Sequence, residues 1–262
     1  MDIPVFFVDA FSKGPFTGNP AAICPLEEWL PDAIMQSIAS EHNLSETAFV
    51  IPLGDDHHIR WFTPSVEVDL CGHATLAAAH VLFRSLPTGQ RMIRLYSRSG
   101  WLEVSREETG RLTLDFPDDP VSPLDKIPAA LMEGMGAEIL EVYRGKFDFM
   151  VCVNDQQTVA ALKPDLRLLG TLPARGIIVT APGDDCDFVS RFFGPACGVD
   201  EDPVTGSAHC TLTNYWATKL GRESFTARQL STRGGWLTTC RKDDRILISG
   251  DCNLYLEGII HL

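Results

Sequence analysis

Most of the chain consists of short stretches in which apolar and polar residues alternate, or in which β-branched and aromatic residues dominate. Residues 111–116 show the alternation clearly, because Leu112, Leu114 and Phe116 are separated by polar residues. A period of two residues places the apolar side chains on one face of a β-strand. The predicted strands are 3–10, 47–52, 58–62, 93–97, 101–105 and 111–116, and then 139–144, 147–153, 176–180, 188–193, 225–232, 236–240, 245–248 and 254–260.

Helical signals mark a smaller set of segments. The predicted helices are 31–41, 72–86 and 207–220. Pro31 suits the first position of a helix, and Ile34, Met35 and Ile38 then lie on one side of it. The second segment is rich in Ala and Leu, which favour helix.

The chain also repeats itself at an offset close to half of its length. The matched pairs are 49–56 with 178–185, 60–64 with 191–195, and 70–74 with 204–208. The order of the three matches is kept, as expected for an internal duplication. We therefore predict an α+β protein with two pseudo-symmetric halves, each a curved, mostly antiparallel sheet wrapped around a central helix.

The best linker between the halves is 116–123, which holds three prolines and has no apolar period. The predicted domains are 1–116 and 117–251, and we expect the last strand, about 252–262, to return to the first domain.

The composition excludes several classes of protein. The chain has 262 residues and a formal net charge of −13, and Lys and Arg form no basic stripe, so we expect neither a nucleic-acid partner nor an anionic membrane partner. There is no apolar run of the roughly 20 residues that span a bilayer, and the N-terminus lacks the features of a signal peptide. The eight cysteines are dispersed without a C-x-x-C pair, which argues against a disulfide scaffold or a structural zinc site. A cytoplasmic location is expected.

Candidate chemistry lies where each repeat passes from a strand through a Gly-containing turn into a helix. At a helix start several backbone N–H groups have no partner within the helix, and the helix dipole is positive there. Gly72 and Gly206 occupy this position, so they either cap their helices or let a carboxylate approach the main chain. If the halves face one another, the two helix starts converge on one cleft for a small anionic metabolite.

Polar residues gather in the same two turns. They are Asp69, Cys71 and His73 in the first turn, and Asp200, Glu201, Asp202, Thr205, Ser207 and His209 in the second. The simplest interpretation of Asp69 and Asp200 is that they are helix N-caps. Asp202 and His73 are a candidate hydrogen-bonded pair across the cleft.

Glu46 is the remaining candidate, because it stands where an apolar strand begins. A glutamate in such a place is either an exposed loop residue or a desolvated acid. Burial disfavours the charged form of a carboxylic acid, which suits a group that takes up and returns protons.

Three segments with these residues resemble the signatures of the phenazine-biosynthesis (PhzF-like) isomerase family, which is similar in fold to diaminopimelate epimerase and proline racemase. The segments are 16–20 together with 43–47, then 69–75, and then 201–209. Their order and spacing match over nearly the whole chain.

The resemblance implies two pseudo-symmetric halves with the active site between them, a homodimer, and no metal or organic cofactor. It implies that Glu46 moves a proton between two carbons of a dihydro-hydroxyanthranilate-like substrate. It also implies that His73, Asp202 and Ser207 bind the substrate or help to protonate it. The N–H groups of Gly72 and Gly206 match those near the substrate carboxylate, so we place both glycines, with Cys71 and Thr205 beside them, on the substrate-binding surface.

One departure from the related epimerases concerns Cys71. It stands where those enzymes place one of two catalytic thiols, but the partner position is Thr205. A racemase that uses two thiols needs one thiol on each face of the substrate carbon, and Thr205 does not provide the second. The sequence therefore favours a packing role for Cys71. The alternatives are an amino-acid racemase or epimerase that uses Cys71, and a family member that only binds a small molecule or acts as a scaffold.

Overall fold

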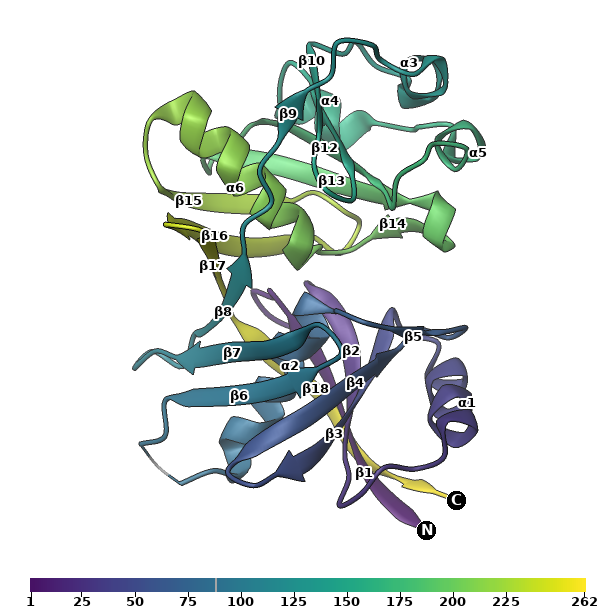
Figure 1. The fold of residues 1–262 in the computed structure, drawn as a ribbon, viewed down its shortest axis with the longest axis vertical. Coiled ribbons are helices and arrows are strands. Elements are labelled where there is room, and N and C mark those ends of the chain that lie inside the picture. Colours follow the sequence, from purple (N-terminus) through teal and green to yellow (C-terminus); the bar gives the residue numbers. More distant parts are fainter. Residues whose placement is uncertain (88) are drawn as a thin grey trace. The chain divides into compact units, whose positions relative to one another are not determined.

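The computed structural model describes residues 1–87 and 89–262, which form two compact units (Figure 1). Unit 1 contains Met1–Asp115 and Ser249–Leu262, and unit 2 contains Phe116–Ile248. The chain therefore leaves unit 1 once and returns to it. The return to unit 1 begins at Ser249, whereas the sequence placed it at about residue 252. A hydrogen bond between Thr113 Oγ1 and Ser249 Oγ (2.7 Å) and one from Arg111 to the Ser249 carbonyl (3.2 Å) hold this residue in unit 1.

The sheet of unit 1 places the first and last strands of the chain side by side. Its strands, in the order in which they pair, are β18 (Cys252–His261), β1 (Asp2–Ala10), β2 (Asn19–Pro25), β3 (Glu46–Leu53), β4 (Asp56–Phe62), β6 (Met92–Ser97), β7 (Gly100–Arg106) and β8 (Leu112–Pro117), with β5 (Glu67–Val68) paired to the end of β4. The pairs β2–β3 and β4–β6 are parallel, and the other pairs in this series are antiparallel.

Two helices cover this sheet. Helix α1 (Asp32–His42) packs Met35 and Ile38 onto a cluster that includes Phe49 of β3. Helix α2 (Gly72–Ser85) packs against β1, β2 and β3 and is buried over most of its length. A helix that is apolar on nearly all sides is stable only inside a protein, which is why the Ala-rich α2 forms the centre of its unit.

Unit 2 has its own set of strands and helices. Its strands are β9 (Ser122–Pro123), β10 (Glu141–Arg144), β11 (Phe149–Cys152), β12 (Ile177–Pro182), β13 (Phe188–Gly194), β14 (Val199–Asp202), β15 (Ser224–Gln229), β16 (Gly235–Lys242) and β17 (Arg245–Gly250). Its helices are α3 (Ala129–Met135), α4 (Gln156–Ala161), α5 (Leu166–Leu169), the 3₁₀ turn η1 (Pro195–Cys197) and α6 (Gly206–Leu220).

The two faces of this sheet have separate cores, because neighbouring residues of a strand point to opposite faces. Met150 and Ile178 pack with Leu212 and other residues of α6. Val151 and Val179, the next residues along β11 and β12, pack instead in the cluster that holds the short helices α3, α4 and α5.

The two units repeat one topology. Apart from α1 in unit 1 and α4, α5 and η1 in unit 2, the order in unit 1 is β2, β3, β4, β5, α2, β6 and β7, and in unit 2 it is β11, β12, β13, β14, α6, β15 and β16. The first two strands of each series are parallel, the third is antiparallel to the second, and the strand after the long helix is parallel to the third. The predicted α+β class, with a sheet and a long central helix in each half, is confirmed.

The sequence did not predict β2, the two-residue strands β5 and β9, strand β14, or helices α3, α4 and α5. Residues Ala21–Cys24 of β2 are all fully buried, so the strand shows no alternation. The three helices have 7, 6 and 4 residues, which is too short for a helical period to show. None of the helices within residues 1–87 and 89–262 combines the length and the apolar character needed to cross a membrane.

Candidate active site

In unit 1, four polar side chains meet where three elements begin. Glu46 is the first residue of β3, and His73 is the second residue of α2, directly after Cys71 and Gly72. Asn19 opens β2, and the parallel register sets Ala21 beside Glu46. We call the group of Asn19, Glu46, Cys71 and His73 the unit 1 site.

The imidazole of His73 is the centre of this site. Its Nε2 lies 3.2 Å from Oε2 of Glu46, and its Nδ1 lies 3.1 Å from Nδ2 of Asn19. Sγ of Cys71 lies 3.6 Å from the same Nδ1. The side chain of His73 is 5% exposed and that of Glu46 is 18% exposed, so Glu46 is not a solvated loop glutamate. The structure thus brings together three of the residues singled out in the sequence.

Charge in this site favours a protonated His73. Burial alone would lower the pKa of His73, but its neighbours Cys71 and Glu46 raise this pKa well above 6.5. Burial, and then the charge of Glu46, raise the pKa of the Cys71 thiol to about 11, so this thiol is neutral near pH 7. The Glu46 carboxylate is therefore the charge that stabilises the imidazolium. A carboxylate in contact with a buried imidazolium can pass and receive a proton.

The start of α2 offers a place for an anion next to this pair. Cys71 occupies the N-cap position but forms no side-chain capping bond, and the first turn contains no acidic residue. Unpaired N–H groups and the positive end of the helix dipole stabilise a carboxylate at such a position. The beginning of α6 in unit 2 has the same properties, with Thr205 at the N-cap position and no capping bond.

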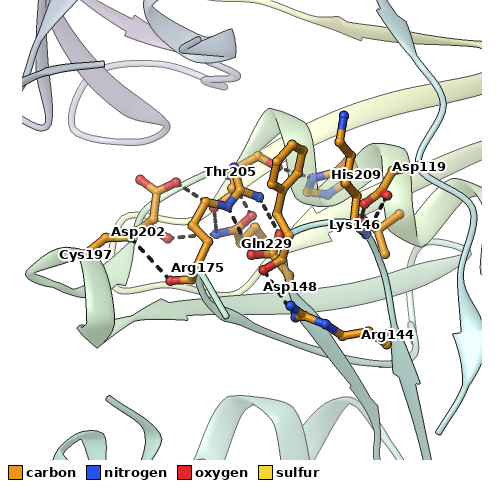
Figure 2. Close-up of polar contacts among 12 residues, drawn as sticks. Asp119, Arg144, Lys146, Asp148, Arg175, Cys197, Asp202, Thr205, His209 and Gln229 are labelled. Carbon is orange, nitrogen blue, oxygen red and sulfur yellow. Dashed lines mark hydrogen bonds and ion pairs between the residues drawn. The ribbon is translucent and has the colours of Figure 1, made fainter. Parts of the chain in front are cut away.

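In unit 2, Thr205 is held by a short network (Figure 2). Its hydroxyl donates to Oδ2 of Asp202 at 2.5 Å, and its N–H donates to Oε1 of Gln229 at 2.9 Å. Nε2 of Gln229 donates to the carbonyl of Asp202 at 2.7 Å. This network fixes the backbone that leads into Gly206 and Ser207, the first two residues of α6.

His209 belongs to the interior of unit 2. The side chain is fully buried, and Nδ1 donates to the carbonyl of Thr205 at 2.8 Å, so the proton of the neutral ring is on Nδ1. Burial lowers the pKa of His209 to about 4. Its role is therefore to support the turn before α6 rather than to bind an anion through a positive charge.

The expectation that Asp69 and Asp200 cap the two helices is wrong. The N-cap positions are Cys71 and Thr205. Asp69 lies 3.5 Å from the guanidinium of Arg98, and Asp200 lies within strand β14. Glu201 also has a structural partner, because Nε of Arg191 lies 2.6 Å from its carboxylate.

Sequence reasoning missed a buried ion pair in unit 2, which Figure 2 shows between Arg175 and Asp148. The Asp148 side chain is fully buried, and Nε of Arg175 donates to its Oδ1 at 3.0 Å. Burial raises the pKa of Asp148, although Arg175 opposes the shift. Arg175 lies just before the matched segment 178–185, as Glu46 lies just before its counterpart 49–56. This alignment is the signal that could have drawn attention to Arg175.

Comparison with known proteins agrees with this fold. The family model described as "Phenazine biosynthesis-like protein" matches residues 8–258. A Pseudomonas aeruginosa protein named as an uncharacterized isomerase is 49% identical over 262 residues, which cover all of both chains. The crystal structure of a PhzF family protein from Enterococcus faecalis covers all of both chains with 44% identity and a TM-score of 0.96.

A more distant structure shares the fold alone. It is named as a predicted epimerase from Pseudomonas aeruginosa, has 22% identity and a TM-score of 0.75, and covers 98% of this chain and 99% of its own. Together, the whole-length match to the family model and the close full-length relatives show that the chain belongs to the phenazine biosynthesis-like protein family.

Proposed function

We propose that the protein is an isomerase that moves a proton between two carbons of a small carboxylate-bearing metabolite similar to a dihydro-hydroxyanthranilate. The observation that carries this proposal is the 3.2 Å contact between the Glu46 carboxylate and Nε2 of the buried His73. It lies beside a helix start whose N–H groups no side chain caps. The names of the close relatives support an isomerase.

In the proposed reaction, Glu46 takes a proton from one carbon of the substrate. The electron pair of that C–H bond moves into the neighbouring π system, and the proton is returned to a second carbon. Bonds and electrons balance within one molecule, so the reaction consumes no oxidant or reductant. Shelter from water keeps the proton on Glu46 long enough to be returned to the substrate.

The remaining residues of the site bind and orient the substrate and the catalytic carboxylate. The N–H groups at Gly72 stabilise the substrate carboxylate, as the start of a long helix stabilises other anions. His73 holds the Glu46 carboxylate in place.

The alternative of a racemase that uses the Cys71 thiol is less well supported. A thiol whose pKa is raised to about 11 is a poor base near neutral pH, because little thiolate is present. The matched position Thr205 holds its hydroxyl against Asp202 and provides no second thiol.

The decisive experiment follows hydrogen exchange by NMR in D₂O, with candidate dihydro-hydroxyanthranilates as substrates. Glu46→Gln has nearly the same shape and should reduce turnover by about 10²–10⁴-fold. Glu41→Gln is the matched control, because Glu41 is exposed on α1 and should retain activity. Activity of the Glu46→Gln variant close to that of the wild type would disprove the proposal.

Two further measurements separate the alternatives. A Cys71→Ala variant that loses turnover, together with deuterium at an α-carbon, would favour the racemase. A protein that only binds would be stabilised against heat by small carboxylates, would lose this effect in His73→Ala, and would exchange no hydrogen.

A further inference from the structure

The unit 1 site has a second chemical property that proton transfer does not use. One donor atom each from Glu46, Cys71 and His73 lie within 4.8 Å of one another. These atoms are a carboxylate oxygen, a thiol sulfur and an imidazole nitrogen. We propose that this site binds one Zn²⁺ ion, and that bound zinc inhibits the protein.

The donor set fits zinc better than a hard cation. Zn²⁺ accepts sulfur, nitrogen and oxygen ligands, whereas Mg²⁺ and Ca²⁺ are bound by oxygen atoms. With Zn–S of about 2.3 Å and Zn–N and Zn–O of about 2.0–2.1 Å, donors in a tetrahedral site lie roughly 3.3–3.6 Å apart. Glu46 Oε2 and His73 Nε2 are already 3.2 Å apart, and Sγ of Cys71 lies within 4.8 Å of a donor atom of each residue.

Two of these atoms already face each other. Oε2 of Glu46 and Nε2 of His73 are both buried and lie 3.2 Å apart, but the contact between them lacks the alignment of a hydrogen bond. A cation bound by both atoms, in place of the proton on His73, would satisfy them together.

The internal duplication predicts one zinc ion per chain. In the repeat, Thr205 and Ser207 occupy the positions of Cys71 and His73. Two hydroxyls are poor ligands for zinc. The eight cysteines are all free, but Cys71 is the one that shares such a cluster with a histidine and a carboxylate among residues 1–87 and 89–262.

Zinc at this site would prevent catalysis, a consequence that rests on the proposed function. Coordination occupies the carboxylate that is needed as the base and the imidazole that holds it. Binding itself does not depend on the reaction, so it can be tested without a substrate.

The test is a titration of metal-free protein with Co²⁺, which replaces zinc in such sites and gives a near-ultraviolet absorption band when a thiolate binds it. We expect one Co²⁺ per chain, the thiolate band, and displacement by one equivalent of Zn²⁺. Cys71→Ser should lose the band and weaken the Kd of zinc at least about tenfold. Cys197→Ser is the control, because Cys197 is exposed and should leave the band unchanged.

Circular dichroism would reveal whether Cys71→Ser fails to fold. A second variant keeps the test valid in that case. Glu46→Gln should keep the thiolate band but weaken zinc binding about tenfold or more. Absence of the band in the wild type, or a zinc Kd that neither variant changes, would overturn the proposal. If the band appears but Glu46→Gln leaves isomerase turnover intact, zinc binding stands and the proposed function fails.

Discussion

The buried His209 should make the protein less stable as the pH falls below 6.5. Its ring is fully buried, and its pKa is about 4 in the folded protein against an ordinary value of 6.5. Between these two values the unfolded chain binds a proton that the folded protein does not bind. The free energy of unfolding therefore falls with decreasing pH, by up to about 1.4 kcal/mol per pH unit.

The total effect can be worked out from the same two pKa values. Near pH 7.5 neither state is protonated at this residue, and His209 contributes almost nothing to the pH dependence. From pH 7.5 to pH 4.5 the loss amounts to about 2–3 kcal/mol. Below about pH 4 the folded protein also takes up the proton, and the loss levels off.

The assay is urea unfolding of the wild type and of His209→Asn at pH 7.5, 6.5, 5.5 and 4.5. The asparagine amide can keep the hydrogen bond to the carbonyl of Thr205, which His209 makes at 2.8 Å, but it does not titrate. The variant should be less stable at pH 7.5 by about 1–3 kcal/mol, because it loses ring packing against Phe188. This difference should shrink and then reverse toward pH 4.5. Parallel pH profiles of the two proteins would refute the reasoning.

The other predictions concern stability in unit 2. Arg175→Met should lower the free energy of unfolding, measured in urea, by about 3–5 kcal/mol, because it leaves the fully buried Asp148 without its partner. Adding Asp148→Asn should recover part of this stability. A loss below about 1 kcal/mol for Arg175→Met would contradict this role of the pair. Gly235→Ala should cost about 1–3 kcal/mol, because a Cβ there would overlap the side chain of Val204, whereas Gly258→Ala meets only ordinary contacts and serves as the control. Equal melting temperatures of these two alanine variants would show that the turn around Val204 adapts freely.

The long elements were predictable because each has a strong local signal. The Ala-rich α2 and the alternating β8 were both found from their own residues. Strand β2 was missed because residues 21–24 are buried on both faces, so nothing in their pattern distinguishes a strand from other buried chain. Short helices such as α5 depend on packing rather than on a period of their own.

The sequence motifs predicted part of the site. Glu46 and His73 were singled out from their places at a strand start and a helix start, and the structure puts them in contact. Asn19 was part of a recognised segment, but its contact with Nδ1 of His73 depends on the register of β2 with β3. Arg175 and Asp148 form a pair that only tertiary structure reveals, because they are far apart in the sequence.

The return of the chain to unit 1 has a consequence for synthesis on the ribosome. Strand β18 pairs with β1 along its whole length, from Asp2 opposite His261 to Ala10 opposite Cys252. All of unit 2 is translated between these two strands, so nascent unit 2 can fold while β1 still lacks its outer neighbour. Until β18 emerges, the exposed edge of β1 is a target for chaperones and for mispairing with other chains.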